Sequence, residues 1–195
     1  KRVFTCLKYI CMKNSYENYY REIEEKHPWF VTRSNLFLSL IPNNKNSSIL
    51  DFGCGTGSFL KKLNSVGYTD LSGVEISETK PSSASDCFVI TKTIPKRKYD
   101  VILMMDVLEH IEDDSAALIK IKSHLKPGGV LLLSVPAYQL LWSEHDTLNM
   151  HFRRYNRKSL SKLIKKANLK TIFITNWNCV FLPLIAFSRL LSKQS

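Results

Sequence analysis

The sequence predicts an α/β fold with a doubly wound, mostly parallel sheet. The first observation behind this prediction is an alternation of short apolar runs with stretches of helical periodicity, which begins at residue 48. The second is size, because 195 residues, 44% of them hydrophobic, suffice for one domain with a sizeable core. We expect a single domain over residues 1–195: a helical cap at 1–47, a core at 48–175 and an apolar segment at 176–195.

Six apolar runs are the predicted strands. Each is short, rich in aliphatic or β-branched residues and apolar at consecutive positions, as is typical of strands covered on both faces. Strands that alternate with helices are joined by right-handed crossovers into a parallel sheet. The runs are Ser48–Phe52, Leu71–Ile76, Cys87–Ile90, Val101–Met105, Val130–Val135 and Thr171–Ile174.

Three helices are predicted between these strands, at Ser58–Val66, Ser115–His124 and Arg157–Ala167. In the last of them, apolar side chains recur at spacings of three and four residues, which predicts one face toward the core. The first 47 residues lie outside the alternation and are predicted to form a helical cap over one side of the sheet. One helix of this cap would place four side chains on a shared face: Tyr16, Tyr19, Tyr20 and Ile23.

Positive charge is concentrated in the last quarter of the chain. The formal net charge is +11 at pH 7, yet residues 151–195 hold ten Lys and Arg and no Asp or Glu. This asymmetry indicates a local anionic partner, such as a phospholipid surface, a phosphorylated substrate or nucleic acid. A solvated helix face is an equal alternative, so contact of residues 151–195 with an anionic membrane is a hypothesis.

The five cysteines are scattered and form no Cys-x-x-Cys pair. Neither a zinc site nor a disulfide framework is predicted, and we expect no metal. Reduced thiols are typical of the cytosol, which is the expected location, with attachment to the inner face of the membrane as a variant. No cleavable signal peptide is expected, because Lys8 interrupts the apolar run Val3–Met12.

A glycine-rich turn follows the first predicted strand, where Asp51–Ser58 reads DFGCGTGS. Glycines allow a sharp turn and a close approach of the backbone to a ligand, and the N–H donors of the next helix favour a negative or polar group. A dinucleotide fingerprint would place its third glycine at position 58, where this chain has serine. The spacing therefore disfavours an NAD-binding oxidoreductase, which we keep as a weaker alternative.

Glu75 stands 18 residues after Gly57, at the end of the second predicted strand. A carboxylate in that place can accept hydrogen bonds from both hydroxyls of a ribose. Several nucleoside sites share this geometry, so it predicts a nucleoside without choosing between NAD and other nucleoside cofactors.

Two further segments make a family resemblance specific. Tyr99–Asp113 reads YDVILMMDVLEHIED, and Leu125–Pro136 reads LKPGGVLLLSVP. With the glycine-rich turn, they resemble the D-x-G-x-G-x-G, Y-D-V-I…D-V-L-E-H and L-K-P-G-G signatures of class I S-adenosylmethionine-dependent methyltransferases. The resemblance covers roughly residues 25–175 and implies a Rossmann-like sheet of seven strands.

Within that superfamily the chain is similar to the type 11/type 23 methyltransferase domains, to which ubiquinone-type O-methyltransferases are related. Glu25–Arg33 resembles an E-x-H-x-W-F-x-x-R opening, and His145–Tyr155 resembles an H-D…G-H-x-R-R-Y segment. Many members of the group modify glycans, lipids or cell-envelope precursors. The resemblance therefore implies methyl transfer to O or N of a small-molecule, glycan or lipid-linked acceptor.

The resemblance also implies a pocket for S-adenosylmethionine, and for its product S-adenosylhomocysteine, at the carboxyl ends of the strands. Glu75 would bind the ribose hydroxyls, and Arg33 would pair with the carboxylate of the cofactor. The turn residues would form the methionine and ribose side of the pocket: Asp51, Gly53, Cys54, Gly55 and Gly57. Residues at the exit of the fourth strand would lie beside the sulfonium, where a carboxylate favours a cation: Asp106, Val107 and Leu108.

Three histidines are candidate bases, because transfer to a hydroxyl or amine requires its proton to be removed. His145 and His151 are the main candidates, with Asp146 able to orient either one. His110 is the third, and its other interpretation is packing at the start of a helix.

Residues in the same segment are candidates for acceptor binding: Arg153, Arg154 and Tyr155. The two arginines could clamp a phosphate or carboxylate of the acceptor. An exposed basic loop is the other interpretation of this pair.

The chain departs from the family pattern in three places. From Glu75 to Asp100 is 25 residues, which is short for a helix, a strand and their connections. The acidic residue usual after the third strand is missing, which leaves the adenine side of the pocket unassigned. Met150 stands where the pattern has a glycine before His151.

Two alternatives remain open at this point. The shortened segment after Glu75 is compatible with a catalytically silent subunit that binds S-adenosylmethionine or acts as a scaffold. The apolar stretch Trp177–Leu191 is too short to span a bilayer, and either lies on a membrane or completes the core. A nucleic-acid methyltransferase is disfavoured, because the chain has no Asn/Asp-Pro-Pro-Tyr/Phe sequence. The sequence does not indicate an oligomeric state.

Overall fold

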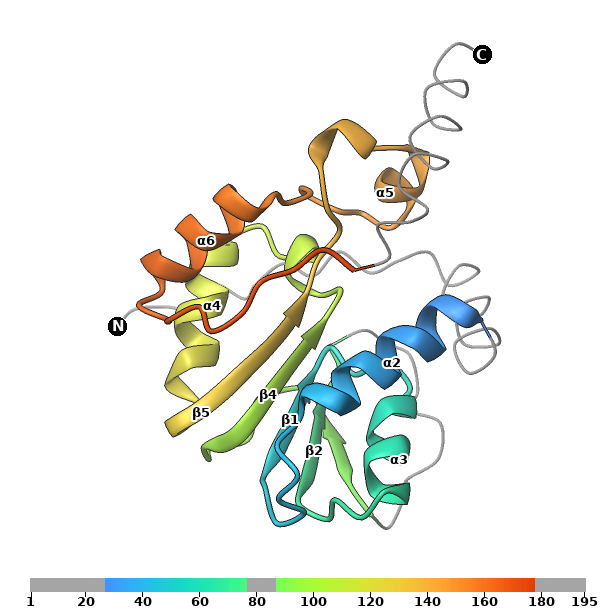
Figure 1. The fold of residues 1–195 in the computed structure, drawn as a ribbon, viewed down its shortest axis with the longest axis vertical. Helices are drawn as coiled ribbons and strands as arrows, with labels where there is room; N and C mark the ends of the chain where they lie inside the picture. Colours follow the sequence, from blue (N-terminus) through green and yellow to red (C-terminus); the bar gives the residue numbers. More distant parts are fainter. Residues whose placement is uncertain (1–26, 77–86, 178–195) are drawn as a thin grey trace.

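The computed structural model describes residues 27–76 and 87–177 (Figure 1). The prediction of an α/β protein with a parallel sheet is confirmed in this part of the chain, where five strands pair in the order β3-β2-β1-β4-β5. The strands are β1 (Ile49–Phe52), β2 (Leu71–Val74), β3 (Val89–Thr91), β4 (Tyr99–Met105) and β5 (Leu125–Ser134).

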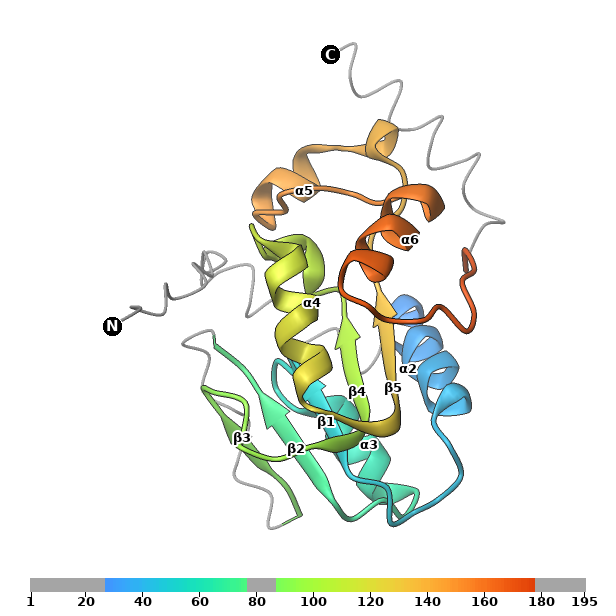
Figure 2. The same ribbon diagram turned by 90° about the vertical axis from the view of Figure 1, so that its left-hand side faces the viewer.

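Helices cover both faces of this sheet. In Figures 1 and 2, α2 and α3 lie over one face, and α4 and α6 over the other. The helices are α2 (Pro28–Leu40), α3 (Ser58–Ser65), α4 (Asp114–Ser123), α5 (Glu144–Leu148) and α6 (Arg157–Lys166). Two short 3₁₀ turns complete the described elements, η1 (Leu108–His110) and η2 (Gln139–Leu141).

Alternate residues of the central strands face opposite layers. Ile49 and Leu103 belong to the apolar cluster that also holds residues of α2 and α3. Leu50 and Met104 belong to the cluster with residues of α4 and α6. All four side chains are fully buried, and burying a side chain of this size contributes about 2 kcal/mol each. Burial on both faces explains why these strands read as continuous apolar runs in the sequence.

The order of the strands determines where a ligand can bind. From β1 the chain proceeds outward through β2 to β3, and then returns to the other side of β1 with β4 and β5. The carboxyl ends of β1 and β4 therefore flank the point at which the direction of winding reverses. Open α/β sheets bind their ligands in the crevice outside such a point.

One predicted strand is wrong. Residues Thr171–Ile174 form neither a strand nor a helix, and Ile172 and Phe173 are 80% and 72% exposed. The run has strand-forming residues, but a strand also requires a hydrogen-bonded neighbour and a covered face, and this segment pairs with none of the five described strands. Seven strands were expected, and residues 27–76 and 87–177 contain five.

Helix α2 lies within residues 1–47, the segment that was expected to form an N-terminal cap. Its start follows from the sequence, because the His27 side chain accepts a hydrogen bond from the Trp29 N–H (3.2 Å) and Pro28 occupies the first turn. The helix buries Phe37 and Arg33 against the body of the molecule. The predicted shared face with Tyr16 and Ile23 lies outside the described residues.

Among the described residues, no helix is both long enough and apolar enough to cross a membrane. Apart from Trp177, the apolar stretch Trp177–Leu191 lies outside them.

Candidate active site

The turn after β1 requires glycine for two different reasons. The φ angles are positive at all three glycines of the turn: 79° at Gly53, 52° at Gly55 and 80° at Gly57. Residues that carry a Cβ rarely adopt such angles. A Cβ on Gly53 would also lie 2.4 Å from a methyl group of Val107, at the exit of β4. The turn and the end of β4 are therefore in close contact at the switch point.

Gly55 differs from its neighbours because a Cβ there would meet no heavy atom within 4 Å. The side of Gly55 on which a Cβ would lie is consequently open. The Gly55 N–H donates a hydrogen bond to Oε2 of Glu75 (2.8 Å) at the end of β2. Glu75, the residue predicted to bind the ribose, thus lies directly against the glycine-rich turn, and its carboxylate holds that turn in place.

Other predicted pocket residues have buried side chains. Asp51 is 1% exposed, and Cys54 is 6% exposed and packs over Gly73. Val107 and Leu108 are 5% and 0% exposed and belong to the core. Cys54, Val107 and Leu108 can therefore contribute only backbone atoms to a pocket.

Asp106 follows β4 in a strained conformation. Its φ angle is 55°, a left-handed value that costs about 1 kcal/mol for a residue other than glycine. Three hydrogen bonds with Ser134 at the end of β5 hold it there. The Asp106 N–H donates to the carbonyl oxygen and to the hydroxyl oxygen of Ser134 (3.2 Å each), and the Ser134 hydroxyl donates to Oδ1 (2.8 Å). Oδ2 accepts a hydrogen bond from Nη1 of Arg33 and forms an ion pair with it.

Arg33 brings helix α2 to the carboxyl ends of the strands. The residue is 8% exposed, and its guanidinium also lies over the ring of Phe30, 5.1 Å from the centroid. Its Nε is buried and has no hydrogen-bond partner among the described residues. Arg33 therefore retains one buried donor toward the site.

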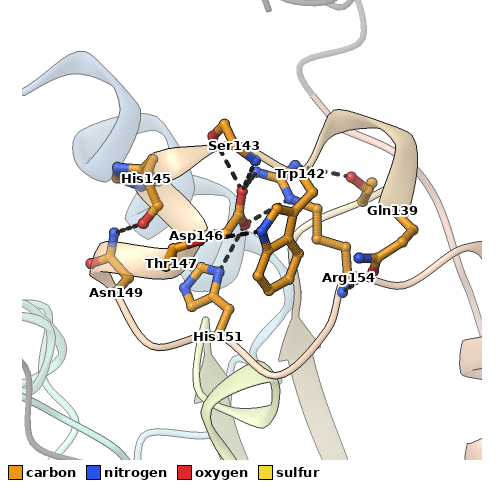
Figure 3. A network of polar contacts seen from close by, with 10 residues as sticks. Gln139, Trp142, Ser143, His145, Asp146, Thr147, Asn149, His151 and Arg154 are labelled. Carbon is orange, nitrogen blue, oxygen red and sulfur yellow. Dashed lines mark hydrogen bonds and ion pairs between the residues drawn. The ribbon is translucent and has the colours of Figure 1, made fainter. Parts of the chain in front are cut away.

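Asp146 is the centre of a second polar group, shown in Figure 3. It is 0% exposed and accepts hydrogen bonds from Nε and Nη2 of Arg154 (2.7 and 2.8 Å) and from the Ser143 N–H (2.9 Å). Burial alone would raise the pKa of Asp146, but the hydrogen bonds from Arg154, Ser143 and His151 outweigh it and hold the pKa at about 2. The carboxylate is ionised at neutral pH.

His151 is oriented by this carboxylate and contacts His110. Nδ1 of His151 lies 2.9 Å from Oδ1 of Asp146, so an ionised Asp146 requires the proton on Nδ1 and leaves Nε2 as the acceptor. The two imidazole rings meet edge to face, with centroids 4.6 Å apart. Burial lowers the pKa of both histidines, that of His110 to about 4 with a further contribution from His151. The structure thus brings His151 and Asp146 together as the sequence predicted.

Glu109 is the site residue that sequence reasoning missed. It is 1% exposed, and burial, reinforced by the nearby Asp106 charge, raises its pKa well above the usual range. Its Oε2 has no hydrogen-bond partner among the described residues. The only signal in the sequence was its place beside His110 within the D-V-L-E-H motif, where the turn η1 directs it inward.

The remaining candidates lie in different settings. Arg153 forms an ion pair with Asp114 (2.9 Å), and the hydroxyl of the buried Tyr155 donates a hydrogen bond to the same carboxylate (3.0 Å). Arg154 is held on Asp146. His145 is exposed, and Figure 3 shows its ring pointing away from that carboxylate.

Met150 explains one departure from the family pattern. Its φ angle is 56°, a conformation that glycine adopts without cost. The backbone here keeps the shape that a glycine would favour, although the residue has changed. On the adenine side of the pocket, residues 77–86 lie outside the described part of the chain.

Known proteins resemble this chain in sequence. A family model described as a methyltransferase domain matches residues 20–173. A ubiquinone biosynthesis O-methyltransferase from Bradyrhizobium sp. (strain ORS 278) is 30% identical over 98 residues, which cover 44% of this chain and 38% of that protein. An uncharacterized methyltransferase of Schizosaccharomyces pombe is 28% identical over 166 residues, covering 69% of this chain and 58% of that protein. The match thus spans well under half of the first of these relatives.

Solved structures share the fold. Phosphoethanolamine N-methyltransferase 2 from Haemonchus contortus, in complex with S-adenosyl-L-methionine, superposes with a TM-score of 0.68 at 18% identity, covering 94% of this chain and 48% of that one. The N-methyltransferase NodS from Bradyrhizobium japonicum, in complex with S-adenosyl-L-homocysteine, gives a TM-score of 0.56 at 19% identity and covers 80% and 85% of the two chains. At these identities the likeness concerns the fold.

Proposed function

The chain belongs to the methyltransferase-domain family whose model matches residues 20–173, and on that premise we propose that it transfers a methyl group from S-adenosylmethionine to an acceptor. The acceptor is a small molecule, a glycan or a lipid-linked compound, methylated at O or N. When bound, S-adenosylmethionine supplies the methyl group from its sulfonium and leaves as S-adenosylhomocysteine.

One observation carries the cofactor assignment: the open backbone of Gly55 and the carboxylate of Glu75 lie together where β1 and β2 end. A nucleoside needs a surface that it can approach closely and an acceptor for its ribose hydroxyls. The side of Gly55 on which a Cβ would lie is open, and the Glu75 carboxylate accepts a hydrogen bond from the Gly55 N–H. The residues present therefore fit the cofactor.

Arg33 and Asp106 would contact the methionine part of the cofactor. The side chain of Asp106 is 31% exposed at the exit of β4, so its carboxylate would face the positive sulfonium. The buried Nε of Arg33 is available for a further acceptor, and the cofactor carboxylate would provide one. This pairing would draw Arg33 partly away from Asp106.

His151 is our candidate for the group that removes a proton from the acceptor. Its Nδ1 is hydrogen-bonded to Asp146, which leaves Nε2 as a proton acceptor. Arg153, with 30% of its side chain exposed, would contact an anionic acceptor, while the buried Arg154 and Tyr155 would position the surrounding segment. The exposed position of His145 makes it the weaker candidate base.

A lipid-linked acceptor would also agree with the surface near α6. Four lysines of this helix, Lys158, Lys162, Lys165 and Lys166, are exposed, and the exposed side chains of Ile172 and Phe173 follow them. Lysines next to exposed apolar side chains favour adsorption to anionic lipid. We include peripheral contact of residues 151–195 with an anionic membrane in the proposal.

Release of S-adenosylhomocysteine tests the proposed activity. Purified protein is incubated with S-adenosylmethionine and pools of hydroxyl and amine acceptors, among them aromatic alcohols, sugars and polyprenyl phosphates. We expect the product in at least one pool, with a methylated acceptor in the same sample by mass spectrometry. Tight cofactor binding without product in any pool would favour the catalytically silent alternative.

A further inference from the structure

Glu109, His110 and His151 converge beside the proposed cofactor pocket. Each residue offers one ligand atom, a carboxylate oxygen or a ring nitrogen, and these three atoms lie within 4.8 Å of one another. Glu109 and His110 come from η1, directly after β4, and His151 comes from the segment that follows α5. We propose that these three residues form a binding site for a divalent transition-metal ion.

The donor set determines the kind of ion. Two imidazoles and one carboxylate are a set that Zn²⁺ and Fe²⁺ use in sites with open positions for water or substrate. Mg²⁺ and Ca²⁺ prefer oxygen ligands alone, so two nitrogen donors disfavour them. The sequence-based expectation of no metal rested on cysteine spacing, which does not report on a site built from histidine and glutamate.

Both histidines are already oriented by a second group. Asp146 accepts from Nδ1 of His151, so Nε2 is the ring nitrogen left to bind an ion. The ring of His110 donates a hydrogen bond to the backbone carbonyl of Asn149. Metal-ligating histidines characteristically donate their second ring N–H to a carboxylate or a backbone carbonyl. The surroundings of this cluster have that arrangement.

Glu109 has a buried oxygen that a bound ion would satisfy. Its side chain is buried, and its Oε2 has no hydrogen-bond partner among the described residues. A buried polar atom without a partner costs about 1–3 kcal/mol, and more when it is charged. Coordination to an ion would satisfy this oxygen.

The neighbouring charges leave room for a cation. Two guanidinium groups lie nearby, but Arg33 is paired with Asp106 and Arg154 with Asp146. Glu109 is thus the carboxylate that no cation neutralises within the cluster. A divalent ion would therefore meet one carboxyl group without an ion-pair partner and two imidazoles.

The position of the ion would bear on the acceptor. This part of the inference rests on the proposed function: a bound ion lowers the pKa of a hydroxyl that it contacts, which favours an oxygen acceptor over an amine. Nε2 of His151 cannot hold a proton and an ion together. In the metal form the ion therefore replaces His151 as the means of activating the acceptor, and the hydroxyl proton passes to solvent water.

Cobalt binding tests the site without cofactor or acceptor. The full chain is treated with a chelator, dialysed and titrated with Co²⁺, while visible absorption and calorimetry are recorded. We expect one tight ion per chain, the d–d bands of nitrogen and oxygen ligation, and displacement by Zn²⁺. Glu109→Gln and His151→Gln should each weaken Co²⁺ binding at least tenfold. Loss of a group that only supports a metal ligand already costs about tenfold to 100-fold in affinity.

Matched controls separate the site from stray ligands. Glu112→Gln and His124→Gln change a glutamate and a histidine outside the cluster and should bind Co²⁺ like the wild type. Far-UV circular dichroism shows whether each variant is folded. Absence of binding by folded wild type, equal affinity in the Glu109 variant, or a sulfur-to-cobalt charge-transfer band would each overturn the proposal. None of these results depends on S-adenosylmethionine, so the proposed function stands or fails separately.

Discussion

Gly53 and Gly55 have the same residue type and similar φ angles, but the surrounding atoms constrain them differently. Alanine at 53 would place its Cβ 2.4 Å from Val107, whereas alanine at 55 meets no atom. We expect Gly53→Ala to lower the free energy of unfolding by about 2–4 kcal/mol, because overpacking adds to the cost of a positive φ. Gly55→Ala should cost about 1 kcal/mol, from φ alone.

Urea denaturation of the two variants measures the difference, and calorimetry with S-adenosylhomocysteine measures its functional side. Gly55→Ala should remain folded and still lose cofactor affinity, because its methyl group would occupy the open side of the turn. Equal stability of the two variants would contradict the assigned packing of Gly53 against Val107.

His110 should titrate far below an ordinary histidine in the metal-free protein. Burial, then the neighbouring His151, lowers its pKa from 6.5 to about 4. Its imidazole should therefore stay neutral at pH 5, where a solvated histidine is charged. Side-chain NMR of chelator-treated, histidine-labelled protein follows the titration, and His110→Asn assigns the resonance. A midpoint near 6.5 would mean that the ring is open to water.

The site residues that could be predicted are those whose role depends on nearby sequence. The turn at 53–57 and Glu75 follow from a strand, a turn and a fixed spacing. Glu109 could not be predicted in the same way, because its surroundings include residues distant in sequence, such as Phe152, whose N–H donates to the Glu109 carbonyl oxygen across 43 positions (2.8 Å). Such distant contacts leave no local periodicity.

At the scale of elements, the short helix α5 depends on one buried carboxylate. Asp146 caps its first turn through the Ser143 N–H and neutralises Arg154. Asp146→Asn leaves a buried guanidinium without its partner, so we expect a loss of about 3 kcal/mol in the free energy of unfolding at pH 7. Glu144→Gln, on the exposed face of the same helix, should change it by less than about 0.5 kcal/mol.

Acid should reduce the contribution of Asp146 in a defined window. Its folded pKa of about 2 lies below the ordinary value of 3.8, so the stability that it contributes is complete above pH 3.8 and is lost as pH falls toward 2. Urea titrations at pH 7, 4 and 2.5 compare wild type with Asp146→Asn. The gap between them should narrow only below pH 4, and a gap that narrows already at pH 6 would contradict this assignment.

The elements that the sequence predicted well are buried on both faces or strongly amphipathic. Strands β1 and β4 and helix α6 lie within a few residues of their predicted bounds. The prediction of a strand at Thr171–Ile174 was wrong, because strand propensity is only a preference for a covered, paired surface. That surface is a property of the whole fold, and this segment has none among the described residues.

At the scale of the whole molecule, the exposed lysines of α6 should govern binding to anionic membranes. Each lysine near such a surface contributes about 1 kcal/mol, so Lys165→Gln/Lys166→Gln should lower the partition coefficient at least tenfold. Sedimentation with phosphatidylserine-containing vesicles in 0.1 M salt measures it. The matched pair Lys96→Gln/Lys98→Gln, in the exposed segment between β3 and β4, should have little effect.

Two outcomes decide this prediction. Equal losses in the two double variants would indicate a general effect of charge and would contradict a specific role for the lysines of α6. Binding that persists on uncharged phosphatidylcholine vesicles would point to the apolar side chains Ile172 and Phe173 instead of the lysines.

The architecture as a whole could be predicted because the alternation of strands and helices restricts the topology to a parallel, doubly wound sheet. That topology also places the turn at 53–57, Glu75 and Asp106 at one switch point. The acceptor could not be predicted, since the residues around His151 come together from separate loops.

Calorimetry with S-adenosylhomocysteine tests the central claim most directly. We predict one-site binding to the wild type and at least tenfold weaker binding to Glu75→Gln, which keeps the shape of the side chain but removes the charge that accepts from the ribose. Asp70→Asn, an exposed acid just before β2, should bind like the wild type. Folded wild-type protein that binds neither S-adenosylhomocysteine nor S-adenosylmethionine would contradict the account.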